Sequence, residues 1–367
     1  MWITSSLSTA KTPIAVALGN FDGVHLGHRG VIQPILKLGD CATLDYPDNL
    51  EIFEPESAAL AALQGYSDCK GRLIQPFSDF ASHQAPPERD QSESARPFVT
   101  VLTFFPHPQE FFTGRSRPLL TPLHEKALQL KQMGVEQLVL LPFNRELAEL
   151  SPQAFVETVL IQKLQARRIS VGVDFRFGHR RAGSSEDLQA IATDYKIPVS
   201  IVPLKFCDNE RISSSRIRQA LQMGNLTQAE KLLGRPYSLT GRVVQGQQLG
   251  RTLGFPTANL KLPPEKFTPS NGVYSVKVYV ASASLQSTPP LPGVMNIGYR
   301  PTVDGQTLTV EVHLLNWSGD LYGQTLTVSL EAFLRPEQKF DSLDSLKAQI
   351  HRDCEAATSR LMVGDLT

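Results

Sequence analysis

Two histidines close a short turn near the start of the chain, and their spacing points to phosphate chemistry. The segment reads G-N-F-D-G-V-H-L-G-H from Gly19 to His28, directly after the apolar run Ile14–Leu18. A buried strand that runs through a turn into a helix leaves free backbone N–H groups at the helix start, where anions bind. His25 and His28 lie beside that position. They suit a polyanion that gains charge as a bond breaks, without the lysine of a Walker loop.

The turn itself needs an adaptable backbone. We expect Gly19 and Gly23 to supply positive φ angles and to let a ligand approach closely. Phe21, Asp22 and Gly27 are the other residues of this string with a candidate role. Two histidines three residues apart also fit a metal pair or ordinary surface side chains. The strand, the glycines and Asp22 together favour the phosphate site.

Two further strings in the first half carry aromatic and basic groups. In T-F-F-P-H-P, from Thr103 to Pro108, two prolines fix the backbone and direct His107 toward the strand ends. In G-V-D-F-R-F-G-H-R-R-A-G, from Gly172 to Gly183, alternating phenylalanines could stack on a planar ring, and the arginines suit phosphate. A rigid turn over a core edge and a solvated basic loop are the simpler interpretations of the two strings.

A third string, I-S-S-S-R-I-R from Ile212 to Arg218, opens a predicted helix. Serines at a helix start are ordinary caps. The hydroxyls of Ser214 and Ser215, the free N–H groups and the side chains of Arg216 and Arg218 also form a phosphate cradle.

In the second half, three glycines and a P-T-A-N string indicate another phosphate site. Gly246, Gly250 and Gly254 follow neither Walker nor Rossmann spacing. In an extended segment Thr257 and Asn259 face the same side, where their oxygens suit Mg²⁺ and a nucleotide phosphate. An ordinary turn at a barrel rim explains this string equally well in isolation.

One carboxylate in the second half is a candidate general base. Along Leu308–Leu314 the apolar residues alternate with polar ones, so that Glu311 shares a face with Thr309 and His313. A carboxylate on a rigid strand can take the proton of a hydroxyl nucleophile. A solvent-facing acid on a half-exposed strand is the alternative.

The elements that must position these groups fall into two regions. Residues 1–234 alternate strands with helices, which predicts a doubly wound parallel sheet that binds its ligands at the carboxyl ends of the strands. Strands are predicted at Ile14–Leu18, Phe98–Phe104, Gln137–Leu141, Ile169–Val173 and Val199–Val202. Helices are predicted over Thr121–Met133, Pro152–Leu164 and Ser185–Tyr195, and Pro34 predicts a kink in the helix after His28.

Residues 235–367 are β-rich and predict a barrel or sandwich followed by a helix over Ser342–Met362. The predicted strands are Ser238–Val244, Gly272–Val280, Leu308–Leu315 and Thr325–Leu334. Residues 40–97 form an insertion without periodicity, with six prolines and eleven acidic against four basic residues, a local charge of −7. We predict a surface insertion that is at least partly disordered.

Bulk properties narrow the class of protein. The 36 basic and 36 acidic side chains cancel, whereas a nucleic-acid-binding protein normally carries a basic excess. No run approaches the roughly 18 apolar residues of a membrane span, and the N-terminus lacks signal-peptide blocks. Four scattered cysteines without a C-x-x-C pair indicate neither zinc nor disulfides. We therefore expect a cytoplasmic metabolic enzyme with no membrane or nucleic-acid partner.

The strings together resemble a known family. Gly19–His28 matches the G-x-F-D-x-x-H-x-G-H signature of nucleotidylyltransferases, and Ile212–Arg218 resembles their second signature. All four strings of the first half occur in the same order in prokaryotic bifunctional riboflavin kinase/FAD synthetases. G-R-x-L-G-F-P-T-A-N, G-V-Y, N-I-G-Y-R-P-T, E-V-H and D-L-Y-G resemble the riboflavin kinase module, over about residues 235–353. The insertion departs from the family, which usually has a short connection there.

The resemblance implies a fold and two activities. The N-terminal domain would be a nucleotidylyltransferase fold, and the C-terminal domain a Greek-key β-barrel with a terminal helix. The barrel would phosphorylate riboflavin from ATP and Mg²⁺, and the N-terminal domain would join FMN to AMP, giving FAD and pyrophosphate.

The resemblance also implies roles for single residues. Glu311 would be the kinase base, and Thr257 and Asn259 would hold the metal. His25 and His28 would be the catalytic residues of adenylyl transfer. The residues implied in binding ATP or phosphate are Gly19, Phe21, Asp22, Gly27, Asp174, Ser214, Ser215, Arg216, Arg218, Gly246, Gly254 and Asn259. Those implied in binding flavin are Phe105, His107, Phe175 and Arg335.

Two other classes of function stay open at this point. One is a nucleotidylyltransferase for a different phosphorylated metabolite, which the second domain argues against. The other is a flavin-sensing or storage protein that kept the fold and lost the chemistry, which the intact candidate residues argue against. Self-association, FMN channelling and the role of the insertion are undetermined by the sequence.

Overall fold

The computed structural model describes residues 1–36, 96–246, 250, 253–281, 289–302 and 305–364. The predicted insertion 40–97 therefore lies outside the described residues, apart from its last two positions. Contacts divide the chain into two compact units. Among the described residues, the first unit holds those up to Arg117 together with Lys126–Phe206, and the second holds Pro118–Glu125 and those from Cys207 onward. The predicted domain boundary at 234/235 stays a prediction.

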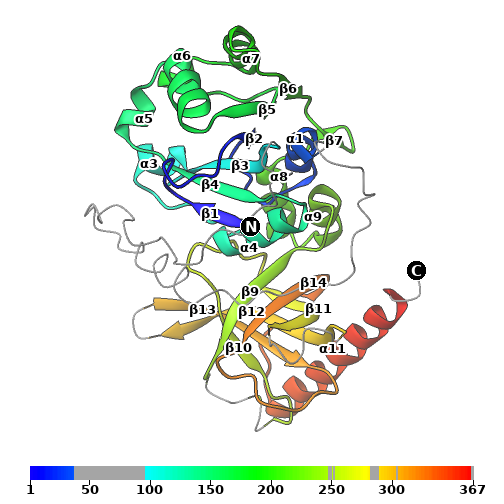
Figure 1. Cartoon of the computed structure of the whole chain (residues 1–367). Helices are drawn as coiled ribbons and strands as arrows, with labels where there is room; N and C mark the ends of the chain where they lie inside the picture. The colour runs from blue at the N-terminus through cyan, green and yellow to red at the C-terminus, as the bar shows by residue number, and fades with distance from the viewer. Residues whose placement is uncertain (37–95, 247–249, 251–252, 282–288, 303–304, 365–367) are drawn as a thin grey trace. The chain divides into compact units, whose positions relative to one another are not determined.

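The first unit is built on a six-stranded parallel sheet in the order β1-β4-β3-β2-β5-β6 (Figure 1). Its strands are β1 (Trp2–Thr4), β2 (Ile14–Leu18), β3 (Phe98–Phe105), β4 (Gln137–Pro142), β5 (Ala166–Gly172) and β6 (Val199–Val202). All five predicted strands are present, although β5 begins three residues before its prediction. The edge strand β1 was not predicted, because three residues are too few to show a period.

Helices cover both faces of this sheet. On β5, Ile169 and Val171 belong to the apolar core that the helix over Phe155–Lys163 shares. Between them, the hydroxyl of Ser170 donates to the carbonyl of Val31 in helix α1 (2.6 Å). Since successive strand residues face opposite sides, α1 and the Phe155–Lys163 helix lie on opposite faces of the sheet. The doubly wound architecture is confirmed.

The predicted helices of the first unit begin and end close to their predicted bounds, and three short helical segments, α3, α5 and η3, were not predicted. They are α1 (Leu26–Leu36), α3 (Pro108–Thr113), α4 (Leu123–Gln132, shared with the second unit), α5 (Arg145–Glu149), α6 (Pro152–Ala154), the π-helix η2 (Phe155–Lys163), the 3₁₀ turn η3 (His179–Arg181) and α7 (Ser185–Asp194). Pro34 does not end α1, which continues to Leu36. A proline in the last turn removes only one of the few remaining helix bonds.

The second unit contains a closed six-stranded antiparallel barrel in the order β10-β13-β12-β11-β14-β9. Its strands are β9 (Ser238–Val244), β10 (Ala258–Lys261), β11 (Gly272–Ala281), β12 (Leu291–Thr302), β13 (Gly305–Leu314) and β14 (Thr325–Arg335). Two of them were not predicted. β10 has four residues, and β12 contains two prolines and two glycines that interrupt its alternation.

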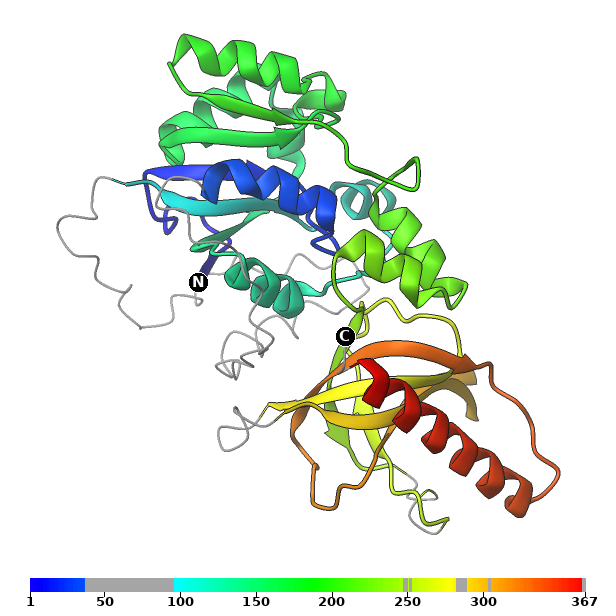
Figure 2. The same ribbon diagram turned by 90° about the vertical axis from the view of Figure 1, so that its right-hand side faces the viewer.

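The hairpin β7 (Phe206–Cys207) and β8 (Glu210–Arg211) precedes two short helices, α8 (Ser214–Gln222) and α9 (Leu226–Leu233). The terminal helix α11 (Leu343–Gly364) packs along the barrel, as the red ribbon in Figure 2 shows, and confirms the predicted tail helix. Its Ala357 is buried in a small apolar cluster with Val273 and Val294. No described helix has the length and apolar composition needed to cross a bilayer.

Candidate active sites

The turn after β2 is held in an unusual backbone conformation. Gly23 has a φ of +91°, as predicted, but the other left-handed residues are Phe21 (φ +50°) and Val24 (φ +42°). Gly19 is not among the residues with positive φ, so that part of the prediction is wrong. Gly19 instead provides space, because a Cβ there would lie 3.2 Å from the ring of Phe21. Phe21 and Val24 are both buried, and their packing offsets the cost of left-handed backbone.

The two histidines of this turn lie against each other. Their rings stack with a centroid distance of 3.6 Å and an interplanar angle of 15°. The backbone N–H of His28 donates to Nδ1 of His25 at 3.3 Å. His25 is 6% exposed, and His28 is half-buried in the first turn of α1. Both histidines therefore lie at the start of a helix, as expected from the sequence, and their role toward phosphate stays a prediction.

A buried lysine that the sequence analysis missed supports this turn. Lys126 Nζ donates to the carbonyl of Asn20 at 2.9 Å, and Thr103 Oγ1 donates to the same carbonyl at 3.2 Å. Burial lowers the pKa of Lys126, whereas the carboxylates of Asp22 and Glu110 raise it. The ammonium group of Lys126 thus holds the backbone of the turn in place at Asn20. The only sequence signal was a charged residue on the inner face of the predicted helix Thr121–Met133.

His107 lies at the end of β3, where its ring caps a helix. Its Nδ1 accepts from the backbone N–H of Gln109 at 3.0 Å, while Glu110 accepts from the backbone N–H of His107 at 3.2 Å. These bonds form a capping box at the start of α3. Burial, followed by the nearby Arg117, lowers the pKa of His107, which favours the neutral ring that can accept a bond. Its position as a cap gives His107 a structural role beside any contact with flavin.

The other aromatic candidates of the first unit lie after strand ends. Phe175 stacks on Phe177 with a centroid distance of 5.7 Å and an interplanar angle of 17°. Phe177 is buried, whereas Phe175 is half-buried and Asp174 is exposed. The half-buried Phe105 ends β3. Phe105 and Phe175 are therefore not fully buried, and their contact with flavin stays a prediction.

The predicted phosphate cradle of α8 belongs to the second unit. Ser213 is the N-cap, accepting from the N–H of Arg216 at 3.3 Å, so that Ser214 and Ser215 occupy the first helical turn. Arg216 is bound to the preceding hairpin, with an ion pair to Glu210 at 2.6 Å. In this structure Arg216 therefore has a protein partner, and its role as a phosphate ligand stays a prediction.

Arg218, on the next turn of α8, lies against another part of the second unit. Its Nη2 donates to the carbonyl of Pro118 at 2.9 Å. Its guanidinium also lies 5.7 Å from the ring centroid of Phe267.

On the barrel, strand register gathers the kinase candidates. Glu311 of β13 is directly opposite Asn259 of β10 and directly opposite Asn296 of β12. Directly opposed residues of antiparallel strands project to the same face with Cβ atoms about 4.5–5.5 Å apart. The predicted alternation is confirmed, since Val310 and Val312 are buried and Glu311 is half-buried. Asn296 was not singled out by sequence, because β12 was not recognised as a strand.

Thr257 joins this face from the segment before β10. Its Oγ1 donates to Oε2 of Glu311 at 3.4 Å. The ring of His313, which is also on β13, makes a 2.8 Å hydrogen bond with the carbonyl of Pro256 and so holds that segment.

The predicted glycines allow close approach around the same face. A side chain at Gly246 would collide with Asn259, and Gly254 has a φ of +90°. Gly246, Thr257, Asn259 and Glu311 are thus brought together as predicted.

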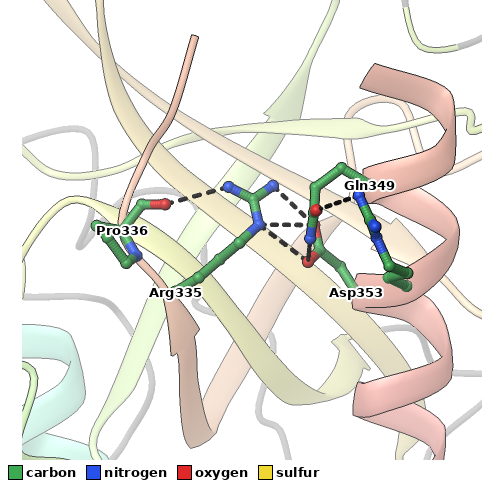
Figure 3. Close-up of polar contacts among 5 residues, drawn as sticks. Arg335, Pro336, Gln349 and Asp353 are labelled. Atoms are coloured by element: carbon green, nitrogen blue, oxygen red, sulfur yellow. Dashed lines mark hydrogen bonds and ion pairs between the residues drawn. The ribbon is translucent and has the colours of Figure 1, made fainter. Parts of the chain in front are cut away.

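Arg335, the predicted flavin-binding residue of the second unit, is bound to the terminal helix (Figure 3). Its Nη2 lies 2.7 Å from Oδ2 of Asp353, and its Nε donates to both carboxylate oxygens. A further guanidinium N–H donates to the carbonyl of Pro336, and Gln349 donates to Asp353. These contacts make Arg335 a connection between β14 and α11.

The fold and the sites define a class of protein. The first unit is a parallel α/β domain with two histidines at a turn suited to phosphate. The second unit contains a barrel on which a carboxylate lies beside side chains that can bind phosphate or a metal ion. This combination is typical of a two-module phosphotransferase. The family model described as FAD synthetase matches residues 7–65 and 88–216, and the riboflavin kinase model matches residues 233–361.

Full-length relatives agree with both models. A bifunctional riboflavin kinase/FMN adenylyltransferase of Escherichia coli K12 is 39% identical, over 92% of this chain and 90% of the relative. A protein of the same name from Haemophilus influenzae is 35% identical, over 94% and 92%. The chain belongs to the family of bifunctional riboflavin kinases/FMN adenylyltransferases, and it carries both enzymatic domains.

A solved structure resembles the chain over its whole length. It is titled a macrolide-efflux protein from Streptococcus pneumoniae, with 29% identity and a TM-score of 0.72, covering 97% of this chain and 98% of that one. Its architecture extends over both units of the present chain.

Proposed function

We propose that the chain makes FAD in two steps at two separate sites, riboflavin phosphorylation on the barrel and FMN adenylylation at the Gly19–His28 turn. The observation that supports this division best is the face around Glu311. There a carboxylate, an amide and a hydroxyl converge on one side of a closed barrel. Nothing in that arrangement depends on the histidine turn.

For the kinase step, Glu311 orients the ribityl 5′-hydroxyl and accepts its proton as the oxygen attacks the γ-phosphorus of ATP. Thr257 and Asn259 offer the hard oxygen atoms that Mg²⁺ prefers, and they lie next to that carboxylate. The residues fit the ion, which would supply neutralisation of the phosphate charge. The collision that a side chain at Gly246 would cause with Asn259 shows that this amide depends on a bare backbone beside it.

For the transfer step, the phosphate of FMN is already anionic at neutral pH, so it needs no strong base. The requirement is positioning and stabilisation of charge on the departing pyrophosphate. His25 and His28, at the positive end of α1, supply donors for that charge. Ser214, Ser215 and Arg218 are the further phosphate ligands that we propose.

In this proposal, aromatic side chains make most of the contacts with the flavin. Phe105 and Phe175 are the proposed contacts for the isoalloxazine ring of FMN. His107 supports flavin binding by fixing the start of α3, and Arg335 supports it by holding α11 against β14. Since the relatives are bacterial biosynthetic enzymes, we also propose a cytoplasmic location. Self-association stays a prediction.

A direct assay tests this function. Purified protein is incubated with riboflavin, ATP and Mg²⁺, and the flavins are separated by chromatography over time. FMN should form first and FAD should follow. If neither product forms, the proposal is wrong.

A further inference from the structure

A cavity of about 500 Å³ lies beside α1, within the first unit and on a part of the helix that the catalytic proposal does not use. It is bounded by α1, by Arg168 of β5, and by Val202 and Lys205 at and after the end of β6. Its volume is within the range of small-molecule sites, roughly 300–1,000 Å³.

The side chains around this cavity are strongly cationic. Arg29, Arg168 and Lys205 all line it, and none of the described residues that line it is acidic. Arg29 and Arg168 are half-buried, whereas Lys205 is exposed. Three positive charges that face one hollow attract an anion with several negative charges.

The sequence of α1 creates room for these groups. Gly30 has no side chain, and a Cβ there would lie 3.2 Å from Cε of Lys205, so the lysine lies directly over the helix backbone. Pro34 has no N–H, which leaves the carbonyl of Gly30 without its usual helix donor. Arg168 Nη1 donates to the carbonyl of Pro34 at 3.4 Å and is thereby held at the cavity.

The cavity is on a different side of α1 from the histidine. At about 100° per residue, Gly30 and Pro34 project roughly 160° and 120° from His28 around the helix axis. Val31, Ile32 and Ile35, which are buried in the core, lie on the same side as His28. The phosphate turn and the cavity are therefore different surfaces of one helix.

We propose that this cavity binds a phosphorylated small molecule that carries a pyrophosphoryl group, such as a nucleoside diphosphate or inorganic pyrophosphate. Guanidinium groups bind phosphate oxygens in a bidentate manner, and the lysine adds a mobile point charge. Val202 and Pro34 give the cavity an apolar wall for a ring attached to the phosphates. This binding is separate from the two catalytic steps.

Calorimetry on the full-length protein tests the proposal, with inorganic pyrophosphate and ADP as probes at low ionic strength. The Arg168→Gln/Lys205→Gln variant removes the two positive charges of the cavity that lie outside α1. It should lower the affinity of one class of binding sites at least roughly tenfold. A matched control, Arg167→Gln/Lys163→Gln, removes the same charge from exposed positions of the same unit and should leave affinity within about twofold of wild type. If the class of sites weakened in the Arg168→Gln/Lys205→Gln variant binds ADP alone, the cavity requires the nucleoside; if that class binds both probes, the cavity is a pyrophosphoryl site.

The location of the ligand supplies a second test that needs no variant. Wild-type crystals soaked in pyrophosphate should show density between Arg29 and Arg168. Isotherms of the two double variants that superimpose, or density confined to the Gly19–His28 turn, would overturn the proposal.

Discussion

The two proposed active sites of this chain are built in opposite ways. The proposed barrel site places Glu311 on a central strand, directly opposite Asn259 on one neighbouring strand and Asn296 on the other. The transferase site places its histidines on an irregular turn with two non-glycine residues at positive φ. Strand register positions the first set of side chains, and a buried lysine from a distant helix supports the second.

This difference predicts how each site responds to an amino-acid substitution. A substitution on the barrel face removes one functional group and leaves the neighbouring strands paired. A substitution of a residue that supports the turn changes the position of backbone and histidines together, since Lys126 and Thr103, both outside the turn, donate to the carbonyl of Asn20. The following changes separate these two behaviours.

The largest effect is expected for Glu311→Gln, which keeps the shape of the side chain but removes the proton acceptor. FMN formation from riboflavin should fall roughly 10²- to 10⁴-fold, the usual contribution of a general base. Conversion of supplied FMN to FAD should stay within twofold of wild type (about 0.4 kcal/mol). Steady-state rates with each substrate check both statements, and a loss of both activities in folded protein would contradict the role of Glu311.

His28→Ala should have the reverse effect. Loss of one donor to the departing pyrophosphate should lower the rate of FAD formation roughly 10²- to 10³-fold. Riboflavin phosphorylation should continue, so that FMN accumulates in the chromatogram. Full-rate FAD synthesis by this variant would rule out the histidine turn as the transfer site.

Lys126→Met sharpens the comparison, since it removes a hydrogen bond that supports the turn at Asn20. Displacement of the turn should lower FAD formation roughly ten- to hundredfold and leave the kinase rate unchanged. Lys131→Met, at an exposed position on the same helix, is the matched control and should be silent. Thr103→Val removes the second donor to the Asn20 carbonyl and should produce a smaller loss. Equal rates for Lys126→Met and Lys131→Met would show that the buried cation does not support the site.

The smallest effect is expected for the cap of α3. Since burial lowers the pKa of His107 below its ordinary value of about 6.5, the unfolded chain binds this proton more readily. The stabilisation is therefore present above about pH 6.5 and is lost as the pH falls below it. At pH 8, His107→Ala should lower the free energy of unfolding by about 1 kcal/mol, and the difference from wild type should shrink by pH 5.

Denaturant titrations of the same variants measure this pH dependence. His107→Asn, which caps at every pH, should remove the pH dependence and keep the stability. A deficit for His107→Ala that is the same at pH 8 and pH 5 would show that protonation of the ring does not affect the cap.

The barrel site was the more predictable of the two. The alternation around Glu311 and the P-T-A-N string are local patterns, and strand pairing brings them together without further information. Asn296 begins the N-I-G-Y-R-P-T string but was given no role, because prolines and glycines interrupt the alternation of β12. Pairing on both sides nevertheless keeps this residue in the barrel.

The sequence predicted which residues form the turn better than it predicted their backbone conformation. Its histidines, helix and Gly23 follow from local rules, whereas the conformation of Phe21 and Val24 depends on their burial in the core. Lys126 lies 106 residues from Asn20, and no local pattern connects the two. His107 and Arg216 were assigned to ligands because their residue types and positions suit ligands, and Arg335 was assigned through the family resemblance. The structure gives each of them a protein partner that lies in neighbouring segments or on another element.

The central claim, that two independent sites act in succession, is tested most directly by mixing the two inactive variants. Glu311→Gln and His28→Ala are combined in equal amounts with riboflavin, ATP and Mg²⁺. Alone, the first should leave riboflavin unchanged and the second should stop at FMN. Together they should produce FAD, because FMN released by one protein is adenylylated by the other. A mixture that accumulates FMN without FAD, while Glu311→Gln still converts supplied FMN, would contradict the claim.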